Sequence, residues 1–155
     1  MAKCVGLFGT CGDSNWREGF IKKFEELGIN FFNPQVKNWT PDFAEIEAEH
    51  LATDEIILFP VTGETYGFGS LAEIGFAVAQ CQQENRHLIV FVDQNLVEDL
   101  EDVLLRKESN RARKLVAAHL NKIDETKPEN IHVVKDLGIM LELARVIYFK
   151  DTFSH

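Results

Sequence analysis

The stretch Glu55-Ile56-Ile57-Leu58-Phe59-Pro60 decides the fold, because its apolar residues follow one another without polar alternation. Such a run predicts a strand in a parallel sheet whose two faces are both covered by helices. Shorter apolar runs at residues 5–8, 29–32, 88–92 and 131–134 predict four further strands.

Amphipathic segments separate these strands. Asn15 and Glu18 form a helix start, and Thr40-Pro41 is another, with proline at the first helical position. We expect further helices over residues 71–83, 96–106, 112–120 and 137–148, the last capped by Asp136. This alternation predicts an α/β fold, a flavodoxin-like or Rossmann-like five-stranded parallel sheet with helices on both faces. We expect one domain spanning residues 1–155.

The composition narrows the class of partner. The chain is 45% hydrophobic and 26% charged, as in a folded globular protein, and its net charge is −9. An acidic chain argues against a broad nucleic-acid-binding face, although a helix N-terminus with one arginine still suits a small anion. No apolar run is long enough to span a membrane, so we expect neither a nucleic-acid nor a membrane partner.

Cysteine usage points to a reducing compartment, and histidine spacing points away from a metal site. Cys4, Cys11 and Cys81 are an odd number without metal-binding spacing, which disfavours disulfides and a structural zinc site. With no signal-peptide pattern at the N-terminus, we expect a cytoplasmic protein. The five histidines are scattered, so we expect no metal site, and no cofactor is implied: they lie at positions 50, 87, 119, 132 and 155.

Ligands of such sheets bind where the strands end, in loops that here hold most of the unusual residues. Gly9-Thr10-Cys11-Gly12 follows the first strand and either holds a phosphate or sugar hydroxyl or is only a tight turn. Asn33 is a candidate pocket wall or a turn residue. Trp39 is either a lid over the core or a surface on which a base stacks.

The turn from Tyr66 to Glu73 follows the third strand and carries a carboxylate into a helix. Gly67 and Gly69 would let a substrate approach the backbone closely, and the positive end of the helix would keep Glu73 ionised as a nucleophile. The competing interpretation is a capping box, in which Glu73 hydrogen-bonds the amide of Ser70.

Two other features have simpler explanations. Cys11 lacks the local histidine that would activate it as a nucleophile. The basic cluster at residues 109–114 reads as a solvated helix start, with contact to an anionic ligand as the alternative.

Taken in order, these segments resemble the nucleoside 2-deoxyribosyltransferase-like family over about residues 3–92. The resemblance is carried by residues 7–12 with Trp16-Arg17, by residues 32–34, and by residues 54–60 and 66–77. The last segment is similar to the family's Gly-x-x-Glu-x-Gly-x-Ala pattern, in which the glutamate attacks the anomeric carbon. The resemblance therefore implies that Glu73 is the nucleophile in cleavage of an N-glycosidic bond.

The resemblance also implies an acid that assists departure of the base, and here the sequence departs from the pattern. Family transferases commonly carry an acidic residue six positions before the nucleophile, where this chain has Gly67. They also carry an aspartate on the helix before the third strand, where this chain has Glu47, with Asp54 or Glu49 as substitutes.

We therefore expect N-glycosidic cleavage or deoxyribosyl transfer on a nucleoside, nucleotide or related metabolite. The sugar or phosphate would contact the Gly9–Gly12 loop and Gly69-Ser70, with Asn33 and Tyr66 as pocket walls. The resemblance implies a homo-oligomer, a dimer or larger. The alternatives are a non-catalytic nucleotide-binding or sensing domain of the same fold, an NAD-type glycohydrolase, and a protein-interaction module.

Overall fold

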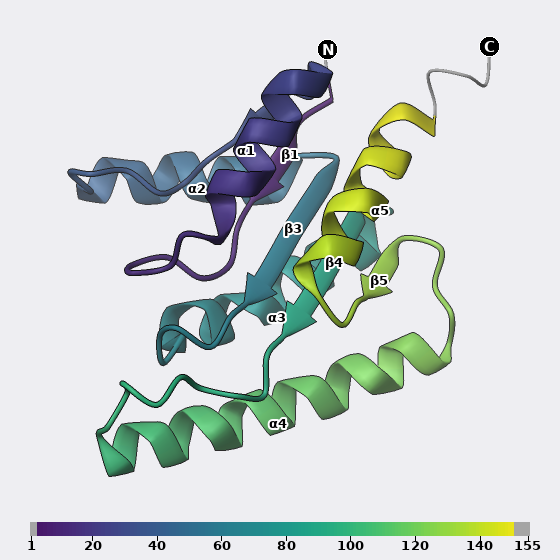
Figure 1. The fold of residues 1–155 in the computed structure, drawn as a ribbon. Helices are drawn as coiled ribbons and strands as arrows, with labels where there is room; N and C mark the ends of the chain where they lie inside the picture. Colours follow the sequence, from purple (N-terminus) through teal and green to yellow (C-terminus); the bar gives the residue numbers. More distant parts are fainter. Residues whose placement is uncertain (1–2, 151–155) are drawn as a thin grey trace.

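The computed structural model describes residues 3–150 and contains five parallel strands with five helices between and after them (Figure 1). The strands are β1 (Val5–Leu7), β2 (Phe31–Phe32), β3 (Ile56–Val61), β4 (His87–Val92) and β5 (Ile131–Val133). The helices are α1 (Trp16–Leu27), α2 (Pro41–Thr53), α3 (Phe68–Glu84), α4 (Val103–Glu125) and α5 (Leu137–Lys150). The expected fold class is confirmed.

The sheet order is β2-β1-β3-β4-β5, the order of flavodoxin-like proteins. Val5 lies opposite Ile56, and Ile56 lies opposite His87, so the central strands begin at one common edge. All carboxyl ends therefore face the opposite edge, where the loops after β1, β2 and β3 meet.

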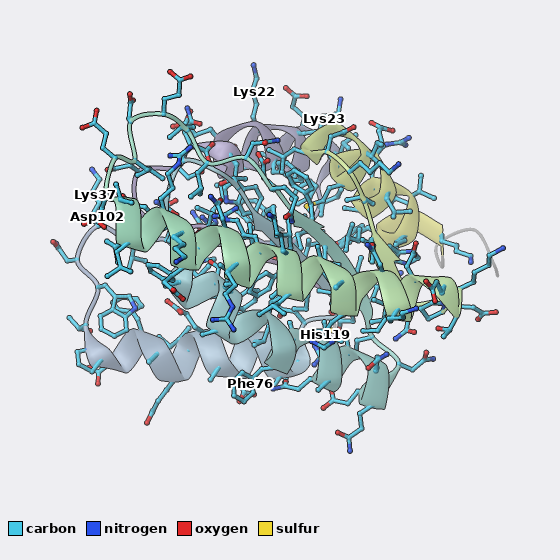
Figure 2. The ribbon with its side chains drawn as sticks, turned by 90° about the horizontal axis from the view of Figure 1, so that it is seen from below. Lys22, Lys23, Lys37, Phe76, Asp102 and His119 are labelled. Carbon is cyan, nitrogen blue, oxygen red and sulfur yellow. The ribbon has the colours of Figure 1, made fainter. Side chains whose placement is uncertain are left out.

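Each face of the sheet has its own apolar core. One core combines the inward residues of α1 and α5 with alternate strand residues such as Leu7 and Leu58. The other lies under α2, α3 and α4 and includes the intervening strand residues Ile57 and Phe59. The view from below separates these layers, with α1 and α5 on one side and α2 and α3 on the other (Figure 2). Burial on both faces is the reason that β3 has no polar alternation.

Most expected element starts are confirmed. Thr40 is the N-cap of α2 with Pro41 at the first helical position, and the Asp136 carboxylate accepts from the Ile139 amide at 2.8 Å. No helix within residues 3–150 has the length and apolar character needed to cross a membrane.

The region after β4 differs from expectation. The predicted helix over 96–106 is wrong at its start, because residues 93–102 form a loop. The predicted helix over 112–120 lies within α4, one continuous helix of 23 residues that follows this loop. Arg106 holds the loop, since its guanidinium donates to the carbonyl oxygens of Leu96, Val97 and Leu100 at 2.8–3.0 Å. The loop's spaced leucines therefore do not form a helical face.

Candidate active site

Two glutamates from neighbouring helices share one pocket at the carboxyl edge of the sheet. Glu73 lies on α3 and Glu47 on α2, and both are partly buried. Two adjoining hollows, of about 200 and 450 Å³, have Glu47, Gly69 and Glu73 in common. The larger hollow is within the size range of ligand pockets, about 300–1,000 Å³.

Burial raises the pKa of Glu73 above its usual range, and the negative charge of Glu47 raises it further. A carboxyl group whose pKa is raised by burial and by a second carboxylate in a pocket is the pattern expected of acid–base or nucleophilic chemistry. The two glutamates are therefore the candidates for chemistry at this site.

The capping-box interpretation of Glu73 does not hold in the structure. α3 begins at Phe68 with Gly67 as its N-cap, and no side chain caps this helix. Ser70 is consequently the third helical residue, and Glu73 lies in the second turn. Our expectation that Glu73 lies in the first turn, where the helix dipole favours the anion, is also wrong, and burial instead raises the pKa of Glu73.

The loop after β1 supplies part of the pocket wall. Gly9, Cys11, Gly69 and Ser70 line the smaller hollow, together with Phe8, Pro34 and the two glutamates. Gly9 has a φ of +94°, and a Cβ there would overlap the carbonyl oxygen of Pro60. Glycine is therefore needed at position 9 for the close approach of the β1 and β3 ends.

The Thr10 hydroxyl and the Gly12 carbonyl oxygen already form hydrogen bonds with other residues of the chain. The Thr10 hydroxyl donates to the Pro60 carbonyl at 3.3 Å and accepts from the Thr62 amide at 2.8 Å, and Thr10 is fully buried. The Gly12 carbonyl accepts from the side-chain amide of Gln35 at 3.0 Å. These contacts fit the tight-turn interpretation of the loop.

Arg17 is a site residue to which the sequence had assigned no role. Its buried guanidinium donates to the carbonyl oxygens of Leu7, Gly9 and Thr10 and lies 3.5 Å from the Cys11 sulfur. Burial lowers its pKa, while Cys11 and then Glu47 act in the opposite direction. The sequence signal that indicates burial of Arg17 is its position next to Trp16 and at helical spacing from Phe20 and Phe24, on the buried face of α1.

Trp39 joins the site through Glu47. Its indole nitrogen donates to Oε1 of Glu47 at 3.2 Å, while 56% of the residue remains exposed. The lid interpretation is wrong, because a tryptophan this exposed does not cover the core. An exposed aromatic face beside a carboxylate pair is instead available to a planar ligand.

Three predicted site residues are not brought into this pocket. The side-chain oxygen Oδ1 of Asn33 accepts from the Gln35 backbone amide at 3.0 Å, so Asn33 forms a turn. The Tyr66 hydroxyl accepts from the Asp102 amide at 3.1 Å, at the start of α4. Asp54 ends α2 just before β3, at the edge of the sheet where the strands begin, and is 3% exposed.

A buried arginine explains why no acid occupies position 67. Arg113 is fully buried and donates to the carbonyl oxygens of Thr62, Thr65 and Asp93 at 2.7–3.1 Å. Gly67 has a φ of +70°, and a Cβ there would lie 2.9 Å from Nη2 of Arg113. The expected solvated helix start at 109–114 is wrong, because Arg113 lies within α4 and fixes the loop that leads to Glu73.

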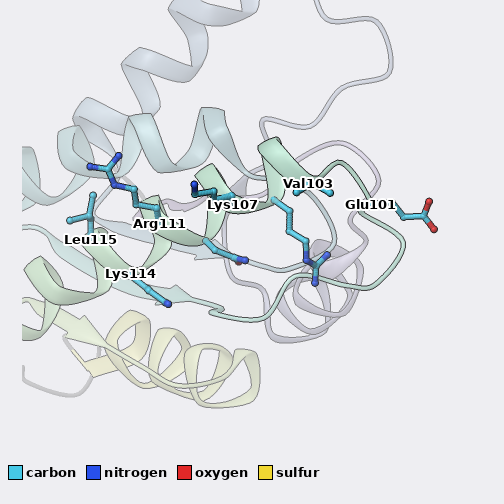
Figure 3. Close-up of a pocket in the computed structure, with 8 residues that line it drawn as sticks. Glu101, Val103, Lys107, Arg111, Lys114 and Leu115 are labelled. Carbon is cyan, nitrogen blue, oxygen red and sulfur yellow. The ribbon is translucent and has the colours of Figure 1, made fainter.

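A larger hollow of about 690 Å³ lies on the outer side of α4, away from the glutamates. Figure 3 shows that its side chains come from successive turns of this one helix and from the loop before it. Lys107, Arg111 and Lys114 make it basic, whereas no carboxylate pair faces it. We therefore treat it as a surface feature and not as the reaction site.

The sequence profile of the nucleoside 2-deoxyribosyltransferase-like family matches residues 3–94, more than half of the chain. The chain belongs to this family. No curated protein matches the chain at a significant level. Among solved structures, a TIR domain from the crystal structure of the RPS4 and RRS1 TIR domain heterodimer matches with a TM-score of 0.52. Its identity is 12% over 100% of both chains, so the likeness concerns the fold alone.

The nucleoside 2-deoxyribosyltransferase-like segment contains β1 to β4 and helices α1 to α3, and thus both glutamates and the glycine loop. Arg113 lies outside it, on α4. The loop before α3 is therefore held by a residue from beyond the matched segment.

Proposed function

We propose that the chain cleaves the N-glycosidic bond of a nucleoside, nucleotide or related metabolite, with Glu73 as nucleophile. The observation that carries this proposal is the pairing of Glu73 with Glu47 across one pocket at the strand ends. Membership of the nucleoside 2-deoxyribosyltransferase-like family supports the same chemistry.

In the proposed reaction the Glu73 carboxylate attacks the anomeric carbon while the bond from that carbon to the base breaks. The bonding electrons pass to the base nitrogen, and Glu47, which carries the single proton of the pair in the reactive form, donates this proton to the departing base. The glycosyl ester on Glu73 is then attacked by water or by a second base, with Glu47 accepting the proton. The sequence of steps requires no cofactor.

Glu47 is the acid that the arrangement favours. It replaces the aspartate expected on the helix before β3, and it lines both hollows with Glu73. Asp54 and Glu49 are less suitable, since Asp54 lies at the opposite edge and Glu49 is exposed. Trp39 would hold one oxygen of Glu47 and offer its exposed ring to the base.

Base release from nucleosides, nucleoside monophosphates and NAD would be measured by chromatography for wild type, Glu73→Gln and Glu47→Gln. Both substitutions should reduce turnover at least about 100-fold, the loss typical of a positioned acid–base group. Glu49→Gln, an exposed glutamate on the same helix as Glu47, serves as the matched control and should keep wild-type turnover.

A fluorinated deoxynucleoside analogue should leave a covalent adduct, detected by intact mass, on wild type and not on Glu73→Gln. Full activity of Glu73→Gln would overturn the mechanism. Release of nicotinamide would identify an NAD-type glycohydrolase, and binding without turnover by both proteins would identify a sensing domain.

We also propose that the chain forms homo-oligomers. Val103, Leu104 and Leu115 of α4 are 53–82% exposed, beside the basic residues of the α4 hollow. The exposed face of α2 is acidic and carries Ile46, so it complements α4 of a second copy. Leu104→Glu should shift the chain toward monomer in light scattering if α4 is the interface.

A further inference from the structure

Three side chains that ligate metals come together at the edge of the sheet where the strands begin. Cys4 precedes β1, while His50 and Asp54 lie one turn apart at the end of α2. A nitrogen, a sulfur and a carboxylate oxygen from these residues all lie within 4.8 Å of one another. None of the three residues lines the Glu47–Glu73 pocket, although His50 lies one turn after Glu47 on α2.

The imidazole is already oriented toward the other two groups. The His50 ring stacks on Phe32 with centroids 3.7 Å apart and an angle of 2° between the planes. Its Nδ1 lies 2.9 and 3.1 Å from the two carboxylate oxygens of Asp54. In a tetrahedral zinc site the ligand atoms are about 3–4 Å apart, because each bond to the ion is about 2.0–2.3 Å. Small movements would therefore suffice to admit the ion.

The Asp54 carboxylate is buried without a full cationic partner in the described part of the chain. It is 3% exposed and contacts the thiol of Cys4 and the ring of His50. Arg86 donates to the backbone oxygen of Asp54 at 2.7 Å and not to the carboxylate. Gly6 leaves the space that the carboxylate fills, since a Cβ there would lie 2.8 Å from Oδ2.

The donor set selects the class of metal. Thiolate and imidazole favour zinc and similar transition metals, whereas magnesium and calcium prefer oxygen ligands throughout. A divalent cation bound by one thiolate, one carboxylate and one neutral imidazole forms a unit of zero net charge. Such a unit is compatible with a half-buried position in a way that two uncompensated anions are not.

We propose that Cys4, His50 and Asp54 bind a zinc ion through Sγ, Nδ1 and a carboxylate oxygen. Cys4 releases its thiol proton to solvent on binding, and neutral His50 carries its proton on Nε2. The fourth position is open to water, because the His50 side chain is 33% exposed. The ion would tie α2 to the start of β1, and α2 also carries Glu47.

Cobalt titration of metal-free full-length protein tests this site. A thiolate-to-cobalt absorption band in the near ultraviolet should appear with one equivalent and disappear in Cys4→Ser. Cys11→Ser is the matched control, since Cys11 is the exposed thiol of the chain, and it should leave the band unchanged. His50→Gln should weaken affinity by at least about 100-fold, because outer-shell partners alone are typically worth 10–100-fold.

Thermal unfolding with Zn²⁺ supplies the second measurement. Wild type should unfold at a temperature that rises with zinc concentration, and Cys4→Ser should not respond. Circular dichroism would verify that each variant is folded. Absence of the band in wild type, or its loss in Cys11→Ser with retention in Cys4→Ser, would overturn the proposal and leave a hydrogen-bonded cluster only.

Discussion

Gly67 lies directly against the guanidinium of Arg113, where a Cβ would come within 2.9 Å of Nη2 and 3.2 Å of Val61 Cγ1. The arginine cannot yield easily, because backbone carbonyl oxygens and the Ser109 hydroxyl hold it in place. An acid at position 67 and an arginine at position 113 are therefore mutually exclusive in this backbone. The carboxylate that lines the same hollows as Glu73 is Glu47.

Gly67→Ala should lower the free energy of unfolding by about 1–3 kcal/mol, because it adds a strained positive φ to a steric conflict. Urea unfolding measures this change. Gly75→Ala, in the same helix with nothing within 4 Å of its Cβ position, should instead be neutral or stabilising. Equal effects of the two substitutions would contradict the packing described around Gly67.

Arg113→Met should lower the free energy of unfolding by roughly 3 kcal/mol or more, since it leaves several buried carbonyl oxygens without a donor. Arg111→Met changes an exposed arginine of the same helix and should alter stability by less than about 0.5 kcal/mol. Denaturant midpoints of the two variants provide the comparison. If Arg113→Met were as stable as Arg111→Met, the arginine would not be what holds the loop before α3.

The carboxyl group of Glu73 should titrate above the usual glutamate range, and Glu47→Gln should bring its pKa down. Carbon-13 NMR of the side-chain carboxyl follows both titrations. The folded pKa exceeds the unfolded one, so the protonated form favours folding and this stabilisation is lost as pH rises through the folded pKa. Glu73→Gln should accordingly unfold at a higher temperature than wild type at pH 7, and a lower one would contradict the raised pKa.

If the proposed reaction holds, two substitutions of Trp39 should separate its hydrogen bond to Glu47 from its stacking on the base. Trp39→Phe keeps an aromatic face but loses the hydrogen bond to Glu47, so kcat and its pH dependence should change while KM stays similar. Trp39→Ala should also raise KM roughly 5- to 150-fold, from about 1–3 kcal/mol of base stacking. Lys37→Ala, an exposed residue of the same loop, is the control. An unchanged KM in Trp39→Ala would exclude stacking.

Much of the fold could be predicted from local patterns. Unbroken apolar runs marked the strands, and the capping residues Thr40 and Asp136 marked two helix starts. The 93–102 loop could not be predicted, because its acidic and apolar spacing resembles a helix. Its non-helical course is held by the Arg106 guanidinium and by the Gly63 carbonyl oxygen, which accepts from the Val97 amide. Tertiary contacts here override the local preference.

Glu73 and Glu47 were both candidates from the sequence, and the structure places them in one pocket. The sequence could not show that Thr10 is tied to Thr62, or that Trp39 reaches Glu47. Such contacts join residues from different segments of the chain, and no helical or strand periodicity in the sequence indicates them. Ser109 and Arg113 did carry a signal, because they lie four residues apart in line with buried Leu120, but their polarity suggested solvent.

The family match ends at residue 94, whereas the fold continues through α4, β5 and α5. α5 provides Met140, Ala144 and Ile147 to the core on one face of the sheet, and β5 covers the edge of β4. A fragment cut at the end of the matched segment would expose that face and an unpaired strand, and would invite aggregation. Protein engineers who wish to transplant the glutamate pocket should therefore move the whole chain, not the matched segment.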